Sequence, residues 1–185
     1  MCAMQEQTGT PLTHEDPTGE HPARPHTGRR RRAALVWVVA LATLAADQAT
    51  KLWALHTLTP GVSKPLIGDL IGLRLVRNAG AAFSSLDTAT IVVTLVALLI
   101  VAGLLYYVHT RALSRVSALC LGLIAGGALG NLIDRAAREP GFLRGHVVDF
   151  IDYFGWFVGN VADIAIVVAA LVLVAVSWRS ERSDG

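Results

Sequence analysis

The segment GNLIDRAAREPGFLRGHVVDFIDYFGWFVGNVADIAI (Gly130–Ile166) decides the fold, because it is a polar stretch set between long apolar blocks. Ionisable residues next to membrane-spanning sequence are costly and usually mark a functional site. Asp134, Asp149 and Asp163 are the candidates for chemistry in this segment, and Asp152 is a weaker one. The segment therefore indicates a polar site held between membrane spans.

The composition places the chain in the membrane class. Of its 185 residues, 53% are hydrophobic and only 16% are charged, whereas a soluble domain carries about 25% charged residues. Four apolar blocks have about the length that crosses a bilayer, and they cover residues 33–58, 88–108, 116–135 and 160–178. We therefore expect an all-α membrane protein with four transmembrane helices, in which residues 33–178 form one domain.

The segment between the first two spans, residues 59–87, differs in composition from the spans. Pro and Gly punctuate it, and Ile71, Leu73 and Leu75 alternate with Gly72, Arg74 and Val76. Alternation with a period of two is typical of a strand. We expect a small extracytoplasmic β element that lies at the membrane surface.

Basic residues predict the topology. Arg29–Arg32 end a polar amino-terminal tail, residues 1–32, whose composition predicts disorder. Arg111 and Arg115 follow the second span, and Arg179 and Arg182 begin the tail 179–185. Lys and Arg concentrate on the cytoplasmic side. We therefore expect both termini in the cytoplasm and the polar motifs near the extracytoplasmic face. Because an apolar span follows the arginines at once, we expect no nucleic-acid partner.

Small residues in the third span predict close helix packing. Gly122, Gly126 and Gly130 recur every four residues. They lie on one face of a helix, where small side chains let a second backbone approach.

The three aspartates lie in different surroundings. Asp134 adjoins Arg135, a cation that could keep it ionised. Asp149 has apolar neighbours, which raise the pKa of a carboxyl. Asp163 lies one turn into the fourth span, three residues after Asn160, where the helix dipole favours an anion. Two carboxyls that share one proton need different surroundings, so that one tends to keep the proton and the other tends to be ionised.

Other polar residues leave two interpretations open. Asp47 and Lys51 share a helical face and can pair, either as a structural ion pair or to orient the site. Asn78 to Phe83 can form a turn, or Gly80 and the alanines that follow it can leave room for a peptide backbone held by Asn78.

With these motifs the chain resembles bacterial lipoprotein signal peptidase, or signal peptidase II. The resemblance rests on DQATK (47–51), RNAGAAFS (77–84), GNLIDR (130–135), HVVDF (146–150) and NVADIAI (160–166). It implies a membrane aspartyl endopeptidase with Asp149 and Asp163 as the catalytic pair. It also implies supporting or substrate-binding roles for eight residues: Asp47, Lys51, Asn78, Gly80, Asn131, Asp134, Arg135 and Asn160.

The resemblance also implies the substrate and the reaction. The family cleaves prolipoproteins just before a cysteine that carries a diacylglyceryl group, in the plane of the bacterial cell membrane and in contact with its lipid. The reaction needs no metal or other cofactor, and a monomer is expected to suffice. The alternative is a small proton-coupled transporter or channel that uses intramembrane aspartates.

Overall fold

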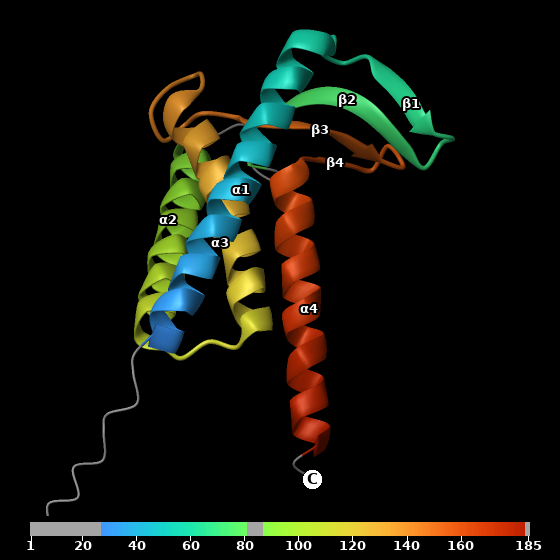
Figure 1. The fold of residues 1–185 in the computed structure, drawn as a ribbon. Coiled ribbons are helices and arrows are strands. Elements are labelled where there is room, and N and C mark those ends of the chain that lie inside the picture. Colours follow the sequence, from blue (N-terminus) through green and yellow to red (C-terminus); the bar gives the residue numbers. More distant parts are fainter. Residues whose placement is uncertain (1–26, 81–86, 184–185) are drawn as a thin grey trace, which may run out of the picture.

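The computed structural model describes residues 27–80 and 87–183 and contains four long helices (Figure 1). They are α1 (Thr27–Thr57), α2 (Asp87–Thr110), α3 (Arg115–Ala137) and α4 (Val161–Ser183). Each contains a segment long and apolar enough to cross a bilayer. The shortest of these segments has 21 residues, or about 31 Å at 1.5 Å per residue. The predicted fold class, an all-α membrane protein with four spans, is confirmed.

Helix ends differ from the predicted spans by a few residues. Helix α1 begins at Thr27 and not at Ala33, so residues 27–32, which were predicted to be disordered, are helical. Arginine is a good helix former, and the apolar span provides a helix for the arginines to extend. Helix α4 continues to Ser183 in the same way, beyond the predicted end at residue 178. Residues 1–26 of the predicted tail and residues 184–185 lie outside the described residues.

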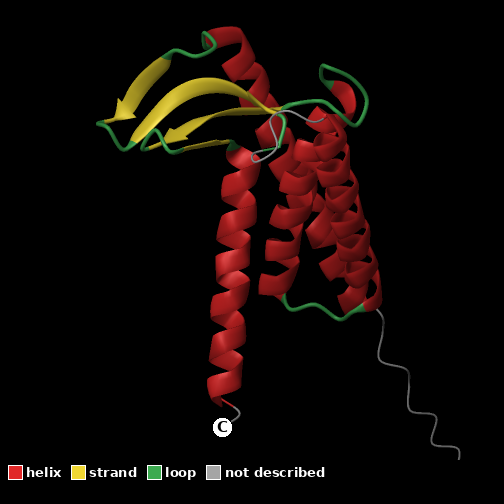
Figure 2. Cartoon of the chain, turned by 180° about the vertical axis from the view of Figure 1, so that it is seen from behind, coloured by secondary structure: helices red, strands yellow, loops and turns green. Residues whose placement is uncertain are grey.

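A four-stranded antiparallel sheet lies across one end of the helices (Figures 1 and 2). Its strands, in spatial order, are β1 (Ser63–Ile67), β2 (Ile71–Asn78), β3 (Val147–Tyr153) and β4 (Phe157–Gly159). The predicted strand at residues 71–76 is part of β2. Strand β4 is followed almost at once by α4, so the sheet is joined directly to the last span.

Strand β3 was not predicted, because the sequence analysis placed HVVDF in a polar connection without regular structure. Most of its residues are buried on both faces, so its sequence VVDFIDY does not alternate between apolar and polar residues. A short apolar run of this kind is typical of a fully covered strand. The β-branched Val147, Val148 and Ile151, between Gly145 and Gly155, were the available signal.

Helix α3 packs against the other three helices, and its glycines permit the close approach. A Cβ atom at Gly122 would lie 2.9 Å from the carbonyl oxygen of Val36, and one at Gly126 would collide with the carbonyl oxygen of Ala40. On another face, a Cβ atom at Gly127 would lie 2.8 Å from the carbonyl oxygen of Ala162. The predicted packing role of the glycine series is confirmed, and Gly127 extends it to α4.

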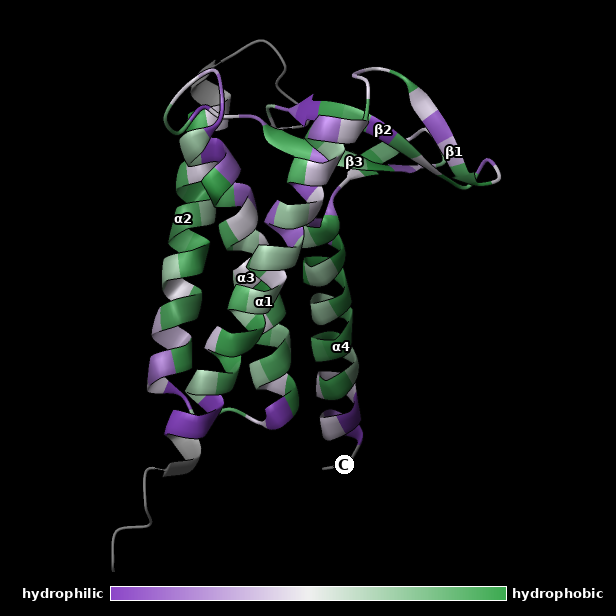
Figure 3. Ribbon diagram, turned by 45° about the horizontal axis from the view of Figure 1, so that its top comes forward, coloured by the Kyte–Doolittle hydropathy of each residue, from purple (hydrophilic) through white to green (hydrophobic). Residues whose placement is uncertain are grey.

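The outer surfaces of the helices are apolar. Figure 3 shows hydrophobic residues along the middle of α2 and α4 and hydrophilic residues at the helix ends. Where α1 meets the sheet there is a buried cluster of Ala54, Leu58, Leu75, Val148 and Phe150. This cluster fixes β3 against the end of α1, and so it fixes the height of the strand that carries Asp149.

Candidate active site

Asp149 lies on β3 with only 2% of its surface exposed, and two amides hold its carboxyl. Asn160 donates from Nδ2 to Oδ1 at 2.6 Å, and Asn78 donates from Nδ2 to Oδ2 at 2.9 Å. The pairing of β2 with β3 brings Asn78 next to Asp149. Within the described residues, no cation forms an ion pair with this carboxyl.

Asp163 lies in the first turn of α4 and forms a reciprocal cap with Asn160. The backbone N–H of Asn160 donates to Asp163 Oδ2, and the backbone N–H of Asp163 donates to Asn160 Oδ1, each at 3.1 Å. This is the arrangement of a capping box, with Asn as the N-cap residue and an acid three residues later. Asn131 on α3 donates from Nδ2 to Asp163 Oδ1 at 3.1 Å. The half-buried carboxyl is thus held as a hydrogen-bond acceptor at the N-terminus of α4.

Asn160 links the two carboxyls. Its side chain is fully buried, its amide donates to Asp149, and its backbone N–H donates to Asp163. Strand β3 and the first turn of α4 are therefore connected through Asn160.

Burial is the main reason why the pKa of Asp149 is raised, to about 6. The hydrogen bonds from Asn78 and Asn160 lower the pKa, the negative charge of Asp163 raises it, and the more distant Lys51 lowers it. The direction agrees with the expectation from the apolar neighbours of Asp149. The raised pKa favours the protonated form of Asp149.

A second group of charges lies deeper in the helices. Lys51 Nζ lies 2.8 Å from Asp47 Oδ2 and 2.8 Å from Asp134 Oδ2, and all three side chains are fully buried. Arg138 Nε lies 2.6 Å from Asp134 Oδ1. Arg135, the neighbouring cation noted for Asp134, interacts with it electrostatically, but the arginine in direct contact with the Asp134 carboxyl is Arg138. Adjacent residues on a helix point in different directions, and Arg138, four residues on, lies on the same face as Asp134.

These ion pairs also hold the elements that carry the candidate site. Asp47 Oδ1 accepts the backbone N–H of Ala162, at the start of α4, at 3.1 Å. Asp134 Oδ2 accepts the backbone N–H of Val148, on β3, at 3.2 Å. Lys51 Nζ also donates to Asn131 Oδ1 at 2.8 Å. The two interpretations of the Asp47–Lys51 pair are therefore compatible, since the pair is both structural and an orienting contact.

Three asparagine amides are oriented in the same way. The side-chain oxygens of Asn131, Asn160 and Asn78 accept from the Lys51 ammonium group, the Asp163 N–H and the Gly80 N–H, respectively. Because these partners can only donate, each amide must turn its NH₂ group away from them. In each case that NH₂ group points to Asp149 or Asp163.

Of the turn predicted for residues 78–83, only residues 78–80 are described, and the chain bends there. Gly80 has a φ of 112°, a conformation that side chains rarely adopt, and its N–H donates to Asn78 Oδ1 at 2.8 Å. Thr90 on α2 donates from Oγ1 to the carbonyl oxygen of Ala79 at 2.8 Å. Residues 81–83, which were expected to leave room for a peptide, lie outside the described residues. That interpretation stays a prediction.

Arg135 lies close enough to the two carboxyls to interact with them electrostatically. Its Nη1 donates to the backbone carbonyl of Asn131 at 3.3 Å. Its Nε is buried and has no hydrogen-bond partner among the described residues. One N–H of this guanidinium group is therefore not used in hydrogen bonding among the described residues.

Two further residues lie near this site, Gln48 and Tyr153, and sequence analysis missed Tyr153. Gln48 donates from Nε2 to the carbonyl oxygen of Gly130 at 3.1 Å, which fixes α1 against α3 beside Asp134. Tyr153 has a raised pKa, mainly through burial and also through the charge of Asp163. Asp149 and Tyr153 lie on one face of β3 because side chains alternate along a strand. Had the strand been recognised, that spacing would have identified Tyr153.

Asp152 does not belong to the candidate site. It lies on the opposite face of β3 from Asp149, where its Oδ2 is 3.0 Å from Nε of Arg74. Its Oδ1 accepts the N–H of Gly155 in the following turn.

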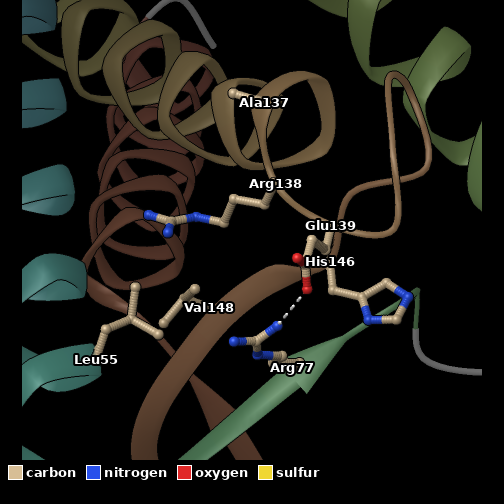
Figure 4. Close-up of a pocket in the computed structure, with 7 residues that line it drawn as sticks. All are labelled: Leu55, Arg77, Ala137, Arg138, Glu139, His146 and Val148. Atoms are coloured by element: carbon tan, nitrogen blue, oxygen red, sulfur yellow. Dashed lines mark ion pairs between the residues drawn. The ribbon is translucent and has the colours of Figure 1, made fainter.

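A pocket of about 330 Å³ lies beside the candidate site but does not include either carboxyl (Figure 4). It contains the exposed ion pair between Arg77 and Glu139, at 3.6 Å. Val148 lines it, and Val148 and Asp149 point to opposite faces of β3. Its lining residues are Leu55, Arg77, Ala137, Arg138, Glu139, His146 and Val148.

Comparisons with known proteins agree on one family. A model of the signal peptidase (SPase) II family matches residues 39–179. The chain is 46% identical to a lipoprotein signal peptidase of Rhodococcus jostii over 183 residues, 99% of this chain and 91% of that protein. It is 47% identical to that of Mycolicibacterium smegmatis over 167 residues, 90% of this chain and 69% of that protein. A bacterial membrane enzyme solved at 2.3 Å superimposes with a TM-score of 0.66 and 26% identity, over 82% of this chain and 92% of that chain.

Proposed function

The chain belongs to the signal peptidase II family, and we propose that Asp149 and Asp163 are the catalytic pair through which it acts. It is a multi-pass membrane aspartyl peptidase whose substrates are prolipoproteins. The transporter alternative is not supported by the family match or by the relatives. The observation that carries the proposed pair is the double contact of Asn160, which donates to both carboxyls.

The proposed reaction uses one shared proton. Asp163, ionised, takes a proton from a water lying between the two carboxyls, and the oxygen of that water bonds to the scissile carbonyl carbon. Asp149, protonated, donates its proton to the carbonyl oxygen, so a gem-diol forms without a covalent enzyme intermediate. Collapse of the gem-diol breaks the C–N bond, and the leaving amine takes the proton from Asp163. A diol proton returns to Asp149.

Hydrogen-bond donors near the pair would hold the substrate in register. The Nε of Arg135 has no hydrogen-bond partner among the described residues. We propose that its guanidinium group donates to a substrate carbonyl. Asn131 and Asn160 orient the carboxyls, and by holding them in one geometry they reduce the entropy cost of the reaction. Every group in this network comes from one chain, so a monomer contains a complete site.

The substrate we propose is the diacylglyceryl form of a prolipoprotein, cleaved just before its lipidated cysteine. Both carboxyls lie where the helices meet the sheet (Figure 1), and a lipid anchored in the bilayer would deliver the peptide at that depth. Arg30, Arg111, Arg115 and Arg179 all lie at the other end of the spans. By the positive-inside rule that end, with both termini, is cytoplasmic and the site faces the other side.

The test is cleavage by the purified full chain in detergent. The substrates are one prolipoprotein with its diacylglyceryl group and the same prolipoprotein with the cysteine unmodified. We expect mass spectrometry to find the released signal peptide only from the lipidated form, cut before the cysteine. Equal cleavage of both forms would overturn the proposed role of the lipid. A folded protein that cleaves neither form would overturn the proposed activity of this site.

A further inference from the structure

The turn between β3 and β4 exposes three aromatic side chains. Trp156 is 93% exposed, Phe154 59% and Phe157 53%. Phe157 also stacks on Tyr153, with ring centroids 6.0 Å apart. Residues 153–162 include no charged residue. We call residues 153–157 the aromatic turn.

The backbone of this turn is an independent observation. Phe154 has a φ of 56° and Gly155 a φ of 74°, and the N–H of Trp156 donates to the carbonyl oxygen of Tyr153 at 3.0 Å. Positive φ at both central residues is the geometry that Asn-Gly adopts most readily. A bulky aromatic residue at the first position is strained, and such strain points to a role for the side chain outside the fold.

The surroundings indicate what this role is. Figure 1 shows the far end of the sheet projecting sideways beyond α4, at about the level where α4 begins. The apolar span of α4 begins at Val161, so the aromatic turn is continuous with a surface that faces lipid. The adjacent β1–β2 turn adds exposed Leu66, Ile67 and Leu70, and the N–H of Phe154 donates to the carbonyl oxygen of Leu70 at 3.0 Å. Trp is typical of the membrane–water interface, and the apolar rings of Phe154 and Phe157 add surface that lipid can cover.

We propose that the aromatic turn is a membrane anchor that inserts into the bilayer interface on the side of the sheet and sets the depth of Asp149 and Asp163. The turn lies between the two carboxyls in the chain, four residues after Asp149 and six before Asp163. Strand β3 and strand β4 connect it rigidly to each of them. The contact with lipid does not depend on the proposed function, whereas the consequence for cleavage does.

The first test measures the depth of Trp156 without using activity. Trp37, Trp53 and Trp178 are replaced by Phe, and the protein is reconstituted in vesicles whose lipids carry bromine at defined depths. We expect bromine near the headgroups to quench Trp156 fluorescence more than bromine near the chain ends, with weak quenching by aqueous acrylamide. Strong acrylamide quenching and no effect of bromine would overturn the anchor, and would favour a site for another protein.

A matched reporter controls for vesicle binding in general. Val62 is an exposed apolar residue in the connection from α1 to β1, which Figure 1 shows above the sheet. A second variant carries Val62→Trp together with Trp156→Phe and the three other replacements. We expect acrylamide and not bromine to quench this reporter. Equal quenching of both reporters by bromine would show that the aromatic turn lies no deeper in the lipid than the connection at Val62 does.

The second test concerns depth and cleavage. Phe154→Asn suits the turn geometry, and Trp156→Gln removes the other exposed ring, so the double variant should fold. We expect a several-fold loss of kcat/KM on lipidated prolipoprotein in vesicles and no loss in detergent. An unchanged rate in vesicles would overturn the depth-setting role. Inactivity of the unmodified protein in both media would instead count against the proposed function.

Discussion

Two pairs of carboxyls lie in one hydrogen-bond network, and their charge is balanced in different ways. Asp47 and Asp134 both contact the ammonium group of Lys51, and Asp134 also contacts Arg138. Asp149 and Asp163 receive hydrogen bonds from amide groups of asparagines and of the backbone. A carboxylate held by cations stays ionised, whereas one held by neutral donors can exchange a proton. The first pair is therefore suited to fix the structure, and the second is suited to chemistry.

Neutralising one aspartate at a time tests this division most directly. We expect Asp149→Asn and Asp163→Asn each to reduce kcat by at least about 10²–10⁴-fold, since each removes a proton-transfer group. Each variant should still fold but lose about 1–3 kcal/mol of stability, because both oxygens of each carboxyl accept hydrogen bonds and an amide retains only one acceptor oxygen. The measurement is a single-turnover assay with lipidated prolipoprotein.

Asp152→Asn is the matched control for these variants, because Asp152 lies on the same strand but faces the other way. It should keep nearly normal turnover. Normal turnover in Asp149→Asn would break the comparison and move the chemistry to Asp134.

Removing the shared cation tests the structural pair. Lys51→Met leaves two buried carboxylates without their common partner, and breaking a buried ion pair typically costs about 3–5 kcal/mol. We expect a loss of that size in the free energy of unfolding, measured by denaturant titration in detergent. Lys64→Met, at an exposed position of β1, should change it by less than about 0.5 kcal/mol. Equal stability of the two variants would show that the ion pairs do not hold the fold.

Gly130 tests how closely the structural pair is packed. A Cβ atom there would collide with Asp47 Oδ2 and lie 3.0 Å from Asp47 Cγ. The carboxylate cannot move aside without stretching its contacts with Lys51 and the Ala162 N–H. We expect Gly130→Ala to destabilise the protein by about 1–3 kcal/mol, as overpacking does. Gly103→Ala, with open space around it, should be neutral or slightly stabilising, and equal melting temperatures would contradict this explanation.

The contact of Asp47 with Lys51 was easier to predict from sequence than the contacts of the candidate catalytic pair. Asp47 and Lys51 are four residues apart on a helix, and the glycines repeat every four residues, so both features follow from local periodicity. The four spans were predictable from the length of the apolar blocks. The contact of Lys51 with Asp134 was not predicted, since it depends on how two distant helices pack.

The candidate catalytic pair depends on tertiary structure throughout. Its residues were found through the resemblance and through their apolar neighbours, but the strand that carries Asp149 has no alternating pattern. The orientation of the amides of Asn78, Asn131 and Asn160 also depends on donors from other elements or from the next turn. No spacing in the sequence shows which end of an asparagine faces an aspartate.

The smallest expected effect concerns the pH dependence of the catalytic pair. Because the pKa of Asp149 is about 6, its proton is present below that pH, and kcat/KM should fall as the pH rises through about 6. The hydrogen bond from Asn78 stabilises the ionised form and so lowers this pKa. Asn78→Ala removes the bond, the pKa should rise further, and the alkaline limb should move up by roughly one pH unit.

The measurement is a pH–rate profile with lipidated prolipoprotein under subsaturating conditions, where kcat/KM reports the groups of the free enzyme. Asp152→Asn should keep the limb of the unmodified protein, because its side chain points away from the pair. An alkaline limb that stays in place in Asn78→Ala, while the acid limb moves to higher pH, would mean that Asp149 acts as the base. The roles of Asp149 and Asp163 would then be exchanged, while the contrast between amide-bound and ion-paired carboxyls would stand.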